Sequence, residues 1–354
     1  MIEIRENIRL APYTTLQVGG DARYFAEPEN EDQLVEALRW AKQRALPAFM
    51  LGGGSNLLVS DSGFNGLVLH IVIAGISTQD FSGERIYSAG AGVEWDKLVA
   101  QAVRDNCAGV ECLSGIPGTV GGTPVQNVGA YGQDVSETIV RVRAIEAATC
   151  ERMEFDNAAC GFSYRQSRFN GSDMGRYILT RVDFALQLGG APKLAYADLK
   201  RYFNGSNDKP LLSNVREAVL NIRRTKGMVL DKNDTESCSA GSFFKNPVVS
   251  HAVYERIATA SATPVPHFEA GPGQVKLAAA WLIEQSGIAR GFALGPVGVS
   301  SKHTLALVNR GGATASDVLR MKDFVQRRVH ERFGVELRPE PVMLGFDVDA
   351  GPQE

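Results

Sequence analysis

Two glycine-rich runs constrain this chain of 354 residues more than any other feature of its sequence. The first is Leu51-Gly-Gly-Gly-Ser-Asn56, and the second extends from Ser114 to Tyr131 as S-G-I-P-G-T-V-G-G-T-P-V-Q-N-V-G-A-Y. Residues without a Cβ let backbone N–H groups approach a ligand closely, and phosphate is the kind of group that such a backbone holds. The two runs therefore predict opposite walls of one dinucleotide-binding site.

The composition indicates a soluble protein with several domains and no strong overall field of charge. A length of 354 residues predicts two or three domains, and a net charge of −3 argues against a nucleic-acid binder while permitting a local anion site. The five cysteines include no C-x-x-C pair, so neither a disulfide framework nor a zinc ribbon is indicated. The acidic N-terminus and the lack of an apolar run approaching ~20 residues predict a cytoplasmic protein without a membrane span.

Hydrophobic periodicity predicts an α+β fold. A helix over residues 31–44 and a strand over Ala48–Leu51 form part of a β-α-β unit that ends near residue 70. A strand over 84–93 ends in Gly90-Ala-Gly92, but Trp95 stands where a dinucleotide fingerprint needs its third glycine, so we interpret this turn as structural. Further predictions are an excursion or linker over 187–212, a domain boundary near 215, and a helix that starts at Ser213 or Asn214 and runs to about Lys226. Beyond it the sequence predicts helices over 274–286 and 316–333 and strands over 293–299 and 304–308.

Few residues outside the glycine runs stand where chemistry is expected. The sequence has no H-E-x-x-H, G-x-S-x-G or Walker lysine motif, so metal and triad chemistry are not indicated. Arg165, in F-S-Y-R-Q-S-R, either clamps a carboxylate or forms a structural ion pair. Ser242, in A-G-S-F-F-K-N-P, either exposes its hydroxyl for chemistry or is an ordinary turn serine. Glu340 lies between two prolines, which either hold its carboxylate at a fixed place or mark a strand edge.

Taken together, G-G-G-S-N-L-L-V, the second glycine run, Y-R-Q-S-R-F, A-G-S-F-F-K-N-P and R-P-E-P resemble the UDP-N-acetylenolpyruvoylglucosamine reductase family. The resemblance covers nearly the whole chain and is to the long-loop branch, within the vanillyl-alcohol-oxidase-like (PCMH-type) flavoproteins. It implies an α+β fold with a two-lobed FAD-binding region and a smaller α+β substrate-binding domain. The implied boundaries are 1–70 for the first lobe, 71–215 for the strand-rich second lobe, 216–334 for the substrate domain and 335–354 for a segment that carries Glu340.

The resemblance also implies an activity. FAD is bound non-covalently, NADPH is the co-substrate, and the enolpyruvyl group of a UDP-sugar enolpyruvate is reduced to give UDP-N-acetylmuramate for peptidoglycan. Such an enzyme serves cell wall biogenesis, and with it cell shape, cell division and the cell cycle, without an obligate protein partner. The implied catalytic residues are Arg165 for charge stabilisation, Ser242 for proton donation and Glu340 for orienting or polarising the substrate carboxylate.

Two sets of binding residues follow from the same resemblance. The implied cofactor contacts are Leu51, Gly52, Gly53, Gly54, Ser55, Asn56, Leu57, Ile116, Pro117, Gly118, Thr119, Gly121, Gly122, Thr123, Gln126, Asn127, Gly129 and Ala130. The candidate substrate contacts are Tyr131, Tyr196, Lys226, Lys245, Asn246 and His303, and no metal ligand is expected. Lys226 ends a predicted helix, where a cation is favoured in any case, and His303 is either a ligand contact or a satisfied loop side chain.

Two other functions fit parts of the sequence. A flavin-dependent alcohol or sugar oxidase of the same superfamily would share the glycine runs, although the first run lacks a histidine or cysteine to tether a covalent flavin. A catalytically silent sensor of nucleotide sugars would keep the fold but need not keep Arg165, Ser242 and Glu340 together. The sequence therefore favours the reductase, with the oxidase as the alternative enzyme.

Overall fold

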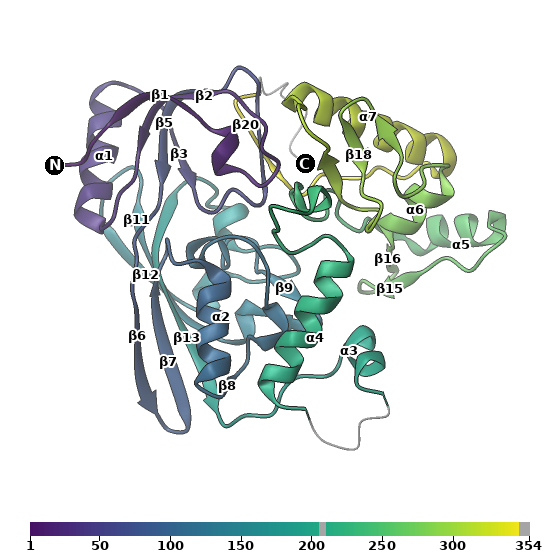
Figure 1. The fold of residues 1–354 in the computed structure, drawn as a ribbon, viewed down its shortest axis with the longest axis horizontal. Coiled ribbons are helices and arrows are strands. Elements are labelled where there is room, and N and C mark those ends of the chain that lie inside the picture. Colours follow the sequence, from purple (N-terminus) through teal and green to yellow (C-terminus); the bar gives the residue numbers. More distant parts are fainter. Residues whose placement is uncertain (205–209, 347–354) are drawn as a thin grey trace. The chain divides into compact units, whose positions relative to one another are not determined.

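The computed structural model describes residues 1–204 and 210–346 (Figure 1). These residues form two compact units, and the chain passes between them repeatedly. The first unit comprises Met1–Ile8, Ala22–Gly54 and Phe64–Val229, and the second comprises Arg9–Asp21, Ser55–Gly63 and Leu230–Glu354. The division after Val229 differs from the boundary predicted near residue 215, because the helix that begins at Leu212 packs within the first unit.

A four-stranded sheet with one covering helix begins the first unit. Its strands lie in the order β1-β2-β5-β3, and β5 pairs in parallel with both β2 and β3. The bounds are β1 Arg5–Arg9, β2 Asp21–Ala26, α1 Glu31–Gln43, β3 Ala48–Leu51 and β5 Phe64–His70. The Asn30 side chain caps α1 by accepting from the Gln33 amide, and the apolar face of α1 is buried against β5. The predicted β-α-β unit and the helix over 31–44 are confirmed.

A larger antiparallel sheet forms most of the rest of the first unit. Its order is β12-β11-β13-β7-β6, with β8 also pairing with β13. The bounds are β6 Ile76–Phe81, β7 Glu84–Gly90, β8 Cys107–Ala108, β11 Ile139–Glu146, β12 Arg152–Asp156 and β13 Tyr177–Leu188. Helix α2 (Trp95–Arg104) lies along this sheet in Figure 1 and buries Trp95, Leu98 and Val99 against it. The Trp95 ring packs on Phe184 at 5.6 Å, and its indole N–H donates to the Leu113 carbonyl at 3.0 Å.

Short elements complete the first unit. They are a hairpin of β9 (Gly129–Ala130) and β10 (Gln133–Asp134), and helices α3 (Ala197–Tyr202) and α4 (Leu212–Thr225). The excursion or linker predicted over 187–212 contains α3, whose Leu199 is buried in one cluster with Val215 and Val219 of α4. Residues 205–209 of that stretch lie outside the described part of the chain.

The second unit contains three small sheets and three helices. One sheet has the order β14-β16-β15, another β17-β18-β19, and β20 pairs in parallel with β4. The strands are β4 Leu57–Val59, β14 Val248–Ser250, β15 His267–Glu269, β16 Gln274–Leu277, β17 Ala293–Leu294, β18 Val297–Val299, β19 Leu307–Asn309 and β20 Val342–Leu344. The helices are α5 His251–Ala260, α6 Ala279–Gln285 and α7 Ala315–Phe333. One hydrophobic core joins them, and it includes the ring pair of Phe243 and Phe244.

Three sequence predictions in the second unit need correction. The helix predicted over 274–286 begins with strand β16, because Val275 and Leu277 alternate with more exposed residues and pair on both sides with neighbouring strands. The strand predicted over 293–299 is a hairpin that turns at Gly295, where φ is 66°. The strand predicted over 304–308 starts only at Leu307, and the residues before it form a turn.

The residues at the two ends of helix α7 determine where the helix begins and ends. Thr314 and Asp317 form a capping box at the first turn, and Gly334 ends the helix in the left-handed region with φ 66°. The Asp61 carboxylate also accepts from the Ala315 and Ser316 amides. Partial burial acts to raise the pKa of Asp61, but these hydrogen bonds together hold the pKa below its ordinary value. The helix predicted over 316–333 is confirmed.

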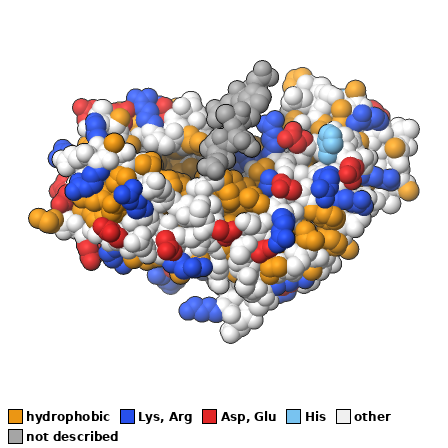
Figure 2. Space-filling model, turned by 90° about the horizontal axis from the view of Figure 1, so that it is seen from above, with side chains coloured by type: hydrophobic (Ala, Val, Ile, Leu, Met, Phe, Trp, Pro, Cys, Tyr) orange, Lys and Arg blue, Asp and Glu red, His pale blue; other side chains and the backbone are white. Residues whose placement is uncertain are grey.

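Charge is mixed on the surface that Figure 2 shows. Lysine and arginine side chains alternate there with aspartate and glutamate side chains. The interspersed signs agree with the small net charge of −3 and give this face no single field of charge.

We expect Trp95→Ala to lower the free energy of unfolding by about 3–5 kcal/mol, since it removes a fully buried aromatic side chain and leaves the Leu113 carbonyl without its donor. Urea unfolding followed by circular dichroism measures this. Phe81→Ala is the control, because the Phe81 side chain is 67% exposed and should change the stability by less than about 0.5 kcal/mol. Equal losses in the two variants would contradict the packing described.

Candidate functional site

The two glycine-rich runs meet in the first unit. A Cβ built on Gly53 would lie 2.6 Å from the Cα of Gly118, and one built on Gly52 would lie 2.9 Å from the Thr119 hydroxyl oxygen. Real Cβ atoms do not approach other heavy atoms so closely, so any larger residue at Gly53 would push the runs apart. The structure therefore brings together two segments that the sequence predicted as walls of one site.

Backbone amides without an acceptor gather in these runs. Within residues 1–204 and 210–346, the following amides donate to no other residue: those of Gly52, Gly53, Gly54, Ile116, Gly118 and Thr119. Backbone N–H groups rarely go unpaired unless water or a ligand satisfies them, and adjacent N–H groups form an anion-binding concavity. The diphosphate of a dinucleotide such as FAD fits this donor set, because it offers several acceptor oxygens in a row.

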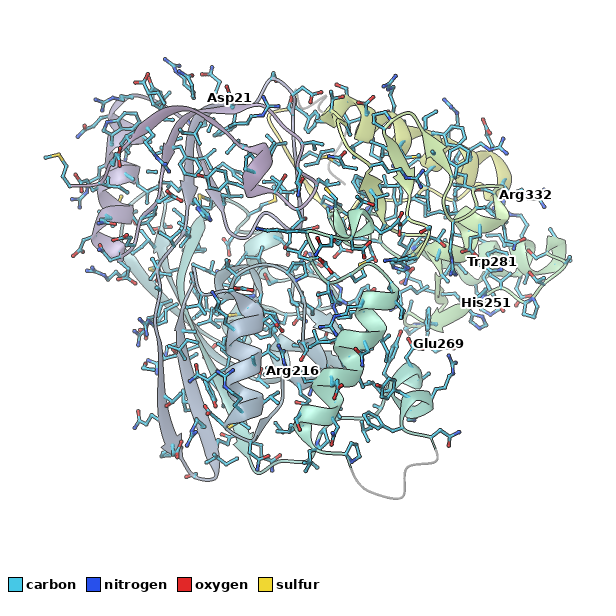
Figure 3. The ribbon with its side chains drawn as sticks, viewed as in Figure 1. Asp21, Arg216, His251, Glu269, Trp281 and Arg332 are labelled. Atoms are coloured by element: carbon cyan, nitrogen blue, oxygen red, sulfur yellow. The ribbon has the colours of Figure 1, made fainter. Side chains whose placement is uncertain are left out.

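An acidic residue fixes the start of the second run. The Asp96 carboxylate accepts from the Gly115 amide at 2.6 Å and from Arg216 in a bidentate pair at 2.7 Å for each oxygen. Burial acts to raise the pKa of Asp96, but Arg216 and the Gly115 amide together hold the pKa below its ordinary value. Arg216, labelled in Figure 3, belongs to α4, so the ion pair ties that helix to the run.

A second arginine of α4 lies close to the same glycine. A Cβ on Gly115 would lie 3.6 Å from Nε of Arg223. This Nε is buried and has no acceptor among the described residues, although Nη2 of the same side chain donates to the Met228 carbonyl at 2.6 Å. An unpaired buried N–H of a cation is costly, so this position favours an additional acceptor beside the second glycine run.

Sequence reasoning missed a buried carboxylate beneath the second run. Glu111 is 1% exposed, and its two oxygens accept from the Gly109 amide at 2.8 Å, the Lys193 amide at 2.9 Å and the Gln133 side chain at 2.9 Å. These bonds join three segments of the first unit around one charge. The only signal in the sequence is a glutamate within the apolar stretch A-G-V-E-C-L, which by itself does not reveal the partners.

Arg165 is held beside the end of the second run. Its guanidinium donates to the carbonyls of Asn127, at 3.3 Å, and Gly129, and it pairs with Asp134 at 3.4 Å. A Cβ at residue 129 would lie 1.5 Å from the Asp134 carboxylate oxygen, so a larger residue there would force the Asp134 side chain to move. Three residues of this cluster, Asn127, Tyr131 and Arg165, adopt positive φ values of 44°, 49° and 55°. Such conformations cost about 1–3 kcal/mol each and are concentrated at functional sites.

Three predicted substrate contacts of the first unit come together. The rings of Tyr131 and Tyr196 make an edge-to-face contact at 5.4 Å, and the Lys226 ammonium lies 5.7 Å from the Tyr131 ring centroid. Lys226 also pairs with Asp198 of α3 at 2.9 Å. Burial acts to lower the pKa of Lys226, but the hydrogen bond with Asp198 and the nearby Tyr131 leave it above its ordinary value. This cluster therefore combines two aromatic rings with an ammonium group that is paired with a carboxylate.

In the second unit, Ser242 lies next to His303. Its Oγ is 3.3 Å from Nε2 of the imidazole, and the following residue, Phe243, donates its amide to the Leu305 carbonyl at 2.7 Å. Gly241 precedes the serine with φ 70°, which only glycine adopts at little cost. Two candidates that the sequence placed in separate motifs are thus in contact.

The Glu340 segment lies beside the serine block. The Glu340 amide donates to the Phe243 carbonyl at 2.9 Å, and the Lys245 amide donates to the Arg338 carbonyl at 3.0 Å. The Asn56 side chain donates to the Glu340 carbonyl at 3.4 Å, where β4 and β20 run in parallel. The structure therefore joins Asn56, the serine block and Glu340 within the second unit, whereas Arg165 belongs to the first unit.

Some predicted contacts have structural partners of their own. The Asn246 side chain caps α6 by accepting from the Ala279 amide at 2.9 Å, and the Asn127 side chain binds backbone groups of Ser163 and Ser136. Gly121 and Thr123 make turn contacts around Val120, where a Cβ on Gly121 would lie 2.6 Å from the Ala91 Cβ. The Lys245 side chain is exposed. These positions shape the backbone whether or not they also touch a ligand.

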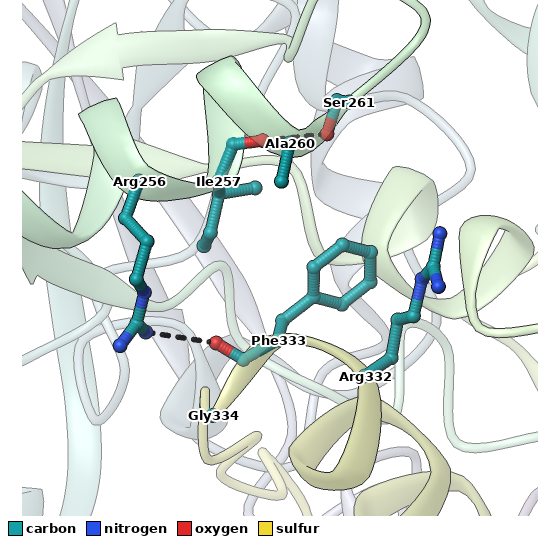
Figure 4. A pocket seen from close by; sticks show the side chains of 7 residues that line it. All are labelled: Arg256, Ile257, Ala260, Ser261, Arg332, Phe333 and Gly334. Atoms are coloured by element: carbon teal, nitrogen blue, oxygen red, sulfur yellow. Dashed lines mark hydrogen bonds between the residues drawn. The ribbon is translucent and has the colours of Figure 1, made fainter.

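One hollow of the second unit lies apart from every predicted residue. It has a volume of about 380 Å³ and is lined by Arg256, Ile257, Ala260, Ser261, Arg332, Phe333 and Gly334, at the ends of α5 and α7 (Figure 4). The Arg256 guanidinium spans its edge and donates to the Phe333 carbonyl at 3.0 Å. Nothing in this hollow matches the chemistry of the glycine runs or the serine block.

Two features of the described residues bear on the class of site. Within residues 1–204 and 210–346, no group of three or more His, Cys, Asp and Glu side chains is arranged to hold a metal ion. Over the same residues, no helix combines the length and the apolar character needed to cross a bilayer.

Comparison with known proteins assigns both units. A model described as an FAD binding domain matches residues 22–153, and one described as the C-terminal domain of UDP-N-acetylenolpyruvoylglucosamine reductase matches residues 233–344. The chain is 44% identical over 349 residues to the reductase of that name from Thermobifida fusca, covering 96% of this chain and 97% of the relative. It is 42% identical over 357 residues to that of Mycobacterium tuberculosis, covering 97% and 95%.

A solved structure supports the same assignment. The UDP-N-acetylenolpyruvylglucosamine reductase of Thermus caldophilus superposes with a TM-score of 0.64 at 26% identity, covering 97% of this chain and 99% of that one. The predicted two-part α+β fold with a PCMH-type FAD-binding region is confirmed. The chain belongs to the UDP-N-acetylenolpyruvoylglucosamine reductase family.

Proposed function

We propose that this chain is an NADPH-dependent flavoenzyme that reduces the enolpyruvyl group of UDP-N-acetyl-3-O-(1-carboxyvinyl)-glucosamine to give UDP-N-acetylmuramate. The observation that carries the proposal is the identity of 42–44% to reductases of this name over at least 96% of the chain. Full-length similarity of this kind favours the reductase over the oxidase alternative. We place the reaction in the cytoplasm, in peptidoglycan precursor synthesis, where it supports cell wall growth, cell shape and division.

The glycine runs are the proposed binding site of FAD. Their six unpaired amides, which meet where Gly53 touches Gly118, would donate to the diphosphate. Arg223 would offer its unpaired Nε–H to an acceptor near Gly115. When bound, FAD supplies the transfer of hydride from NADPH to the enolpyruvyl double bond. The protein supplies binding, orientation and proton transfer.

The substrate carboxylate needs positive charge nearby, because adding hydride to the conjugated double bond makes charge grow on that carboxylate. Arg165 is our candidate, since its guanidinium is already held in one orientation by backbone carbonyls and Asp134. Glu340 would orient or polarise the carboxylate, and Ser242 would give a proton to the neighbouring carbon. The cluster of Tyr131, Tyr196 and Lys226 would bind the UDP portion. Lys245 and Asn246 are further candidates for diphosphate and sugar contacts, and His303 is a further candidate ligand contact.

Separating the two half-reactions tests the proposal. In anaerobic stopped-flow experiments, NADPH should bleach the flavin absorbance, and the enolpyruvyl UDP-sugar should restore it rapidly without oxygen. Flavin that is restored only by air would support the oxidase. A colourless protein that binds the UDP-sugar would support the sensor.

We expect Gly53→Ala to weaken FAD binding by at least about tenfold, because its Cβ would force the two glycine runs apart and displace the unpaired amides. Flavin content after dialysis and titration of the flavin-free protein with FAD measure the effect. Urea unfolding of the flavin-free protein serves as the control for folding. Unchanged FAD affinity in a folded variant would contradict the proposed cradle.

Ser242→Ala should leave the reduction of flavin by NADPH unchanged and slow its reoxidation by the substrate about 10²–10⁴-fold, since only the second step needs a proton on carbon. Stopped-flow absorbance resolves both steps. Ser77→Ala, at an exposed serine of β6, is the matched control and should change neither. Equal slowing of both steps by Ser242→Ala would reject the role of proton donor.

A further inference from the structure

In the contact between Ser242 and His303, the direction of the hydrogen bond decides whether the serine can donate its proton to substrate. A serine hydroxyl carries one proton, and its Oγ also offers acceptor lone pairs. If Ser242 donated this proton to the imidazole, the proton would not be available for a substrate carbon. The productive arrangement is therefore the reverse, in which Nε2–H of His303 donates to Oγ of Ser242 across 3.3 Å.

We propose that His303 positions the Ser242 hydroxyl and returns a proton to it after each transfer. This inference rests on the proposed function and adds a proton path to it. As the C–H bond of the product forms, the O–H bond of Ser242 breaks. Oγ then takes the proton of Nε2, so that the serine is neutral again, and the imidazole takes a proton from solvent. One proton enters for each proton delivered to carbon, and no further oxidant or reductant is needed.

The loop that carries His303 is anchored for this task. The Glu236 carboxylate accepts from the Ser301 amide at 2.7 Å and from the Ser300 hydroxyl, while Lys302 pairs with Asp234 at 2.7 Å. The Ser300 hydroxyl in turn accepts from the His303 amide at 3.3 Å. These four interactions hold the short turn that carries His303 and leads into β19.

The serine side of the contact is equally fixed. The Phe243 amide bonds to the Leu305 carbonyl at 2.7 Å, two residues beyond His303, so the backbones of the two segments cannot slide past each other. Phe243 and Phe244 are almost fully buried and hold the serine segment in the core of the second unit. The 3.3 Å contact is therefore maintained by the fold on both sides.

Several charged groups surround His303 and would influence its titration. Lys302 and its partner Asp234 lie on the adjoining turn, with Glu236 beneath it. Glu284 of α6, paired with Arg290, bonds to the hydroxyl of the next residue, Thr304. Glu340 belongs to the segment that bonds to Phe243.

The test compares His303→Gln with the unchanged holoenzyme. Glutamine keeps an N–H donor of similar reach but cannot give up a proton, so it separates positioning from proton supply. In single-turnover stopped flow we expect reduction by NADPH to change by less than about twofold, and reoxidation by the substrate to slow by about 10²-fold. His330→Gln, at an exposed histidine of α7, is the matched control and should change neither step.

The pH profile distinguishes a proton path from a structural role. In the unchanged enzyme the reoxidation rate should fall as the pH rises through the range where histidine loses its proton, because the neutral imidazole is a weaker acid. His303→Gln should abolish this dependence. His303→Ala, which tests whether a lost side chain simply unfolds the loop, should regain reoxidation rate when imidazole is added.

The outcomes separate this inference from the proposed function. If the unchanged enzyme is not reoxidised by the enolpyruvyl UDP-sugar, the proposed function fails. If it is reoxidised, but His303→Gln keeps both the rate and the pH profile, the inference about His303 is overturned while the function stands. A folded His303→Ala variant that imidazole does not rescue would overturn the proton path in the same way.

Discussion

The first unit is organised around a steric constraint, namely the contact between Gly53 and Gly118. The two runs can approach this closely because residue 53 has no Cβ, which would lie 2.6 Å from the Cα of Gly118. The approach leaves their amides without acceptors in the described chain, which is costly unless a ligand satisfies them. The glycines therefore serve less to make the loops flexible than to hold unpaired donors in one small volume.

Polar networks hold this arrangement. Asp96, Glu111 and Arg165 each bind backbone groups of the second glycine run or of the segments that flank it. Removing a charge from water costs several kcal/mol unless hydrogen bonds replace the lost hydration, and each of these groups has at least three such bonds. The same bonds fix the backbone in conformations, such as the positive φ of Arg165, that local preference opposes. Charged groups thus add to the apolar packing of Val120 and Val128 in fixing this loop.

Local features of the fold were predictable and distant pairings were not. The periodicity of Leu34, Leu38 and Ala41 and the glycine at 334 fixed α1 and the end of α7, because these signals act within one or two turns. Strand β16 was mistaken for helix because its identity depends on β14 and β15, which flank it in space. The motifs also indicated Ser242 and His303 separately, but only the fold revealed their contact, since a separation of 61 positions in sequence carries no signal for it.

The pairing of β4 with β20 has a consequence for how the protein is made. Leu57 of β4 and Val342 of β20 are 285 residues apart in sequence, yet they pair in one small sheet. At about 5–20 residues per second, a ribosome synthesises β20 roughly 14–57 s after β4. During that interval the nascent chain carries an unpaired edge, and the second unit can close only after translation is nearly finished. A chain truncated near its C-terminus would therefore leave β4, which is synthesised early, without its partner strand β20.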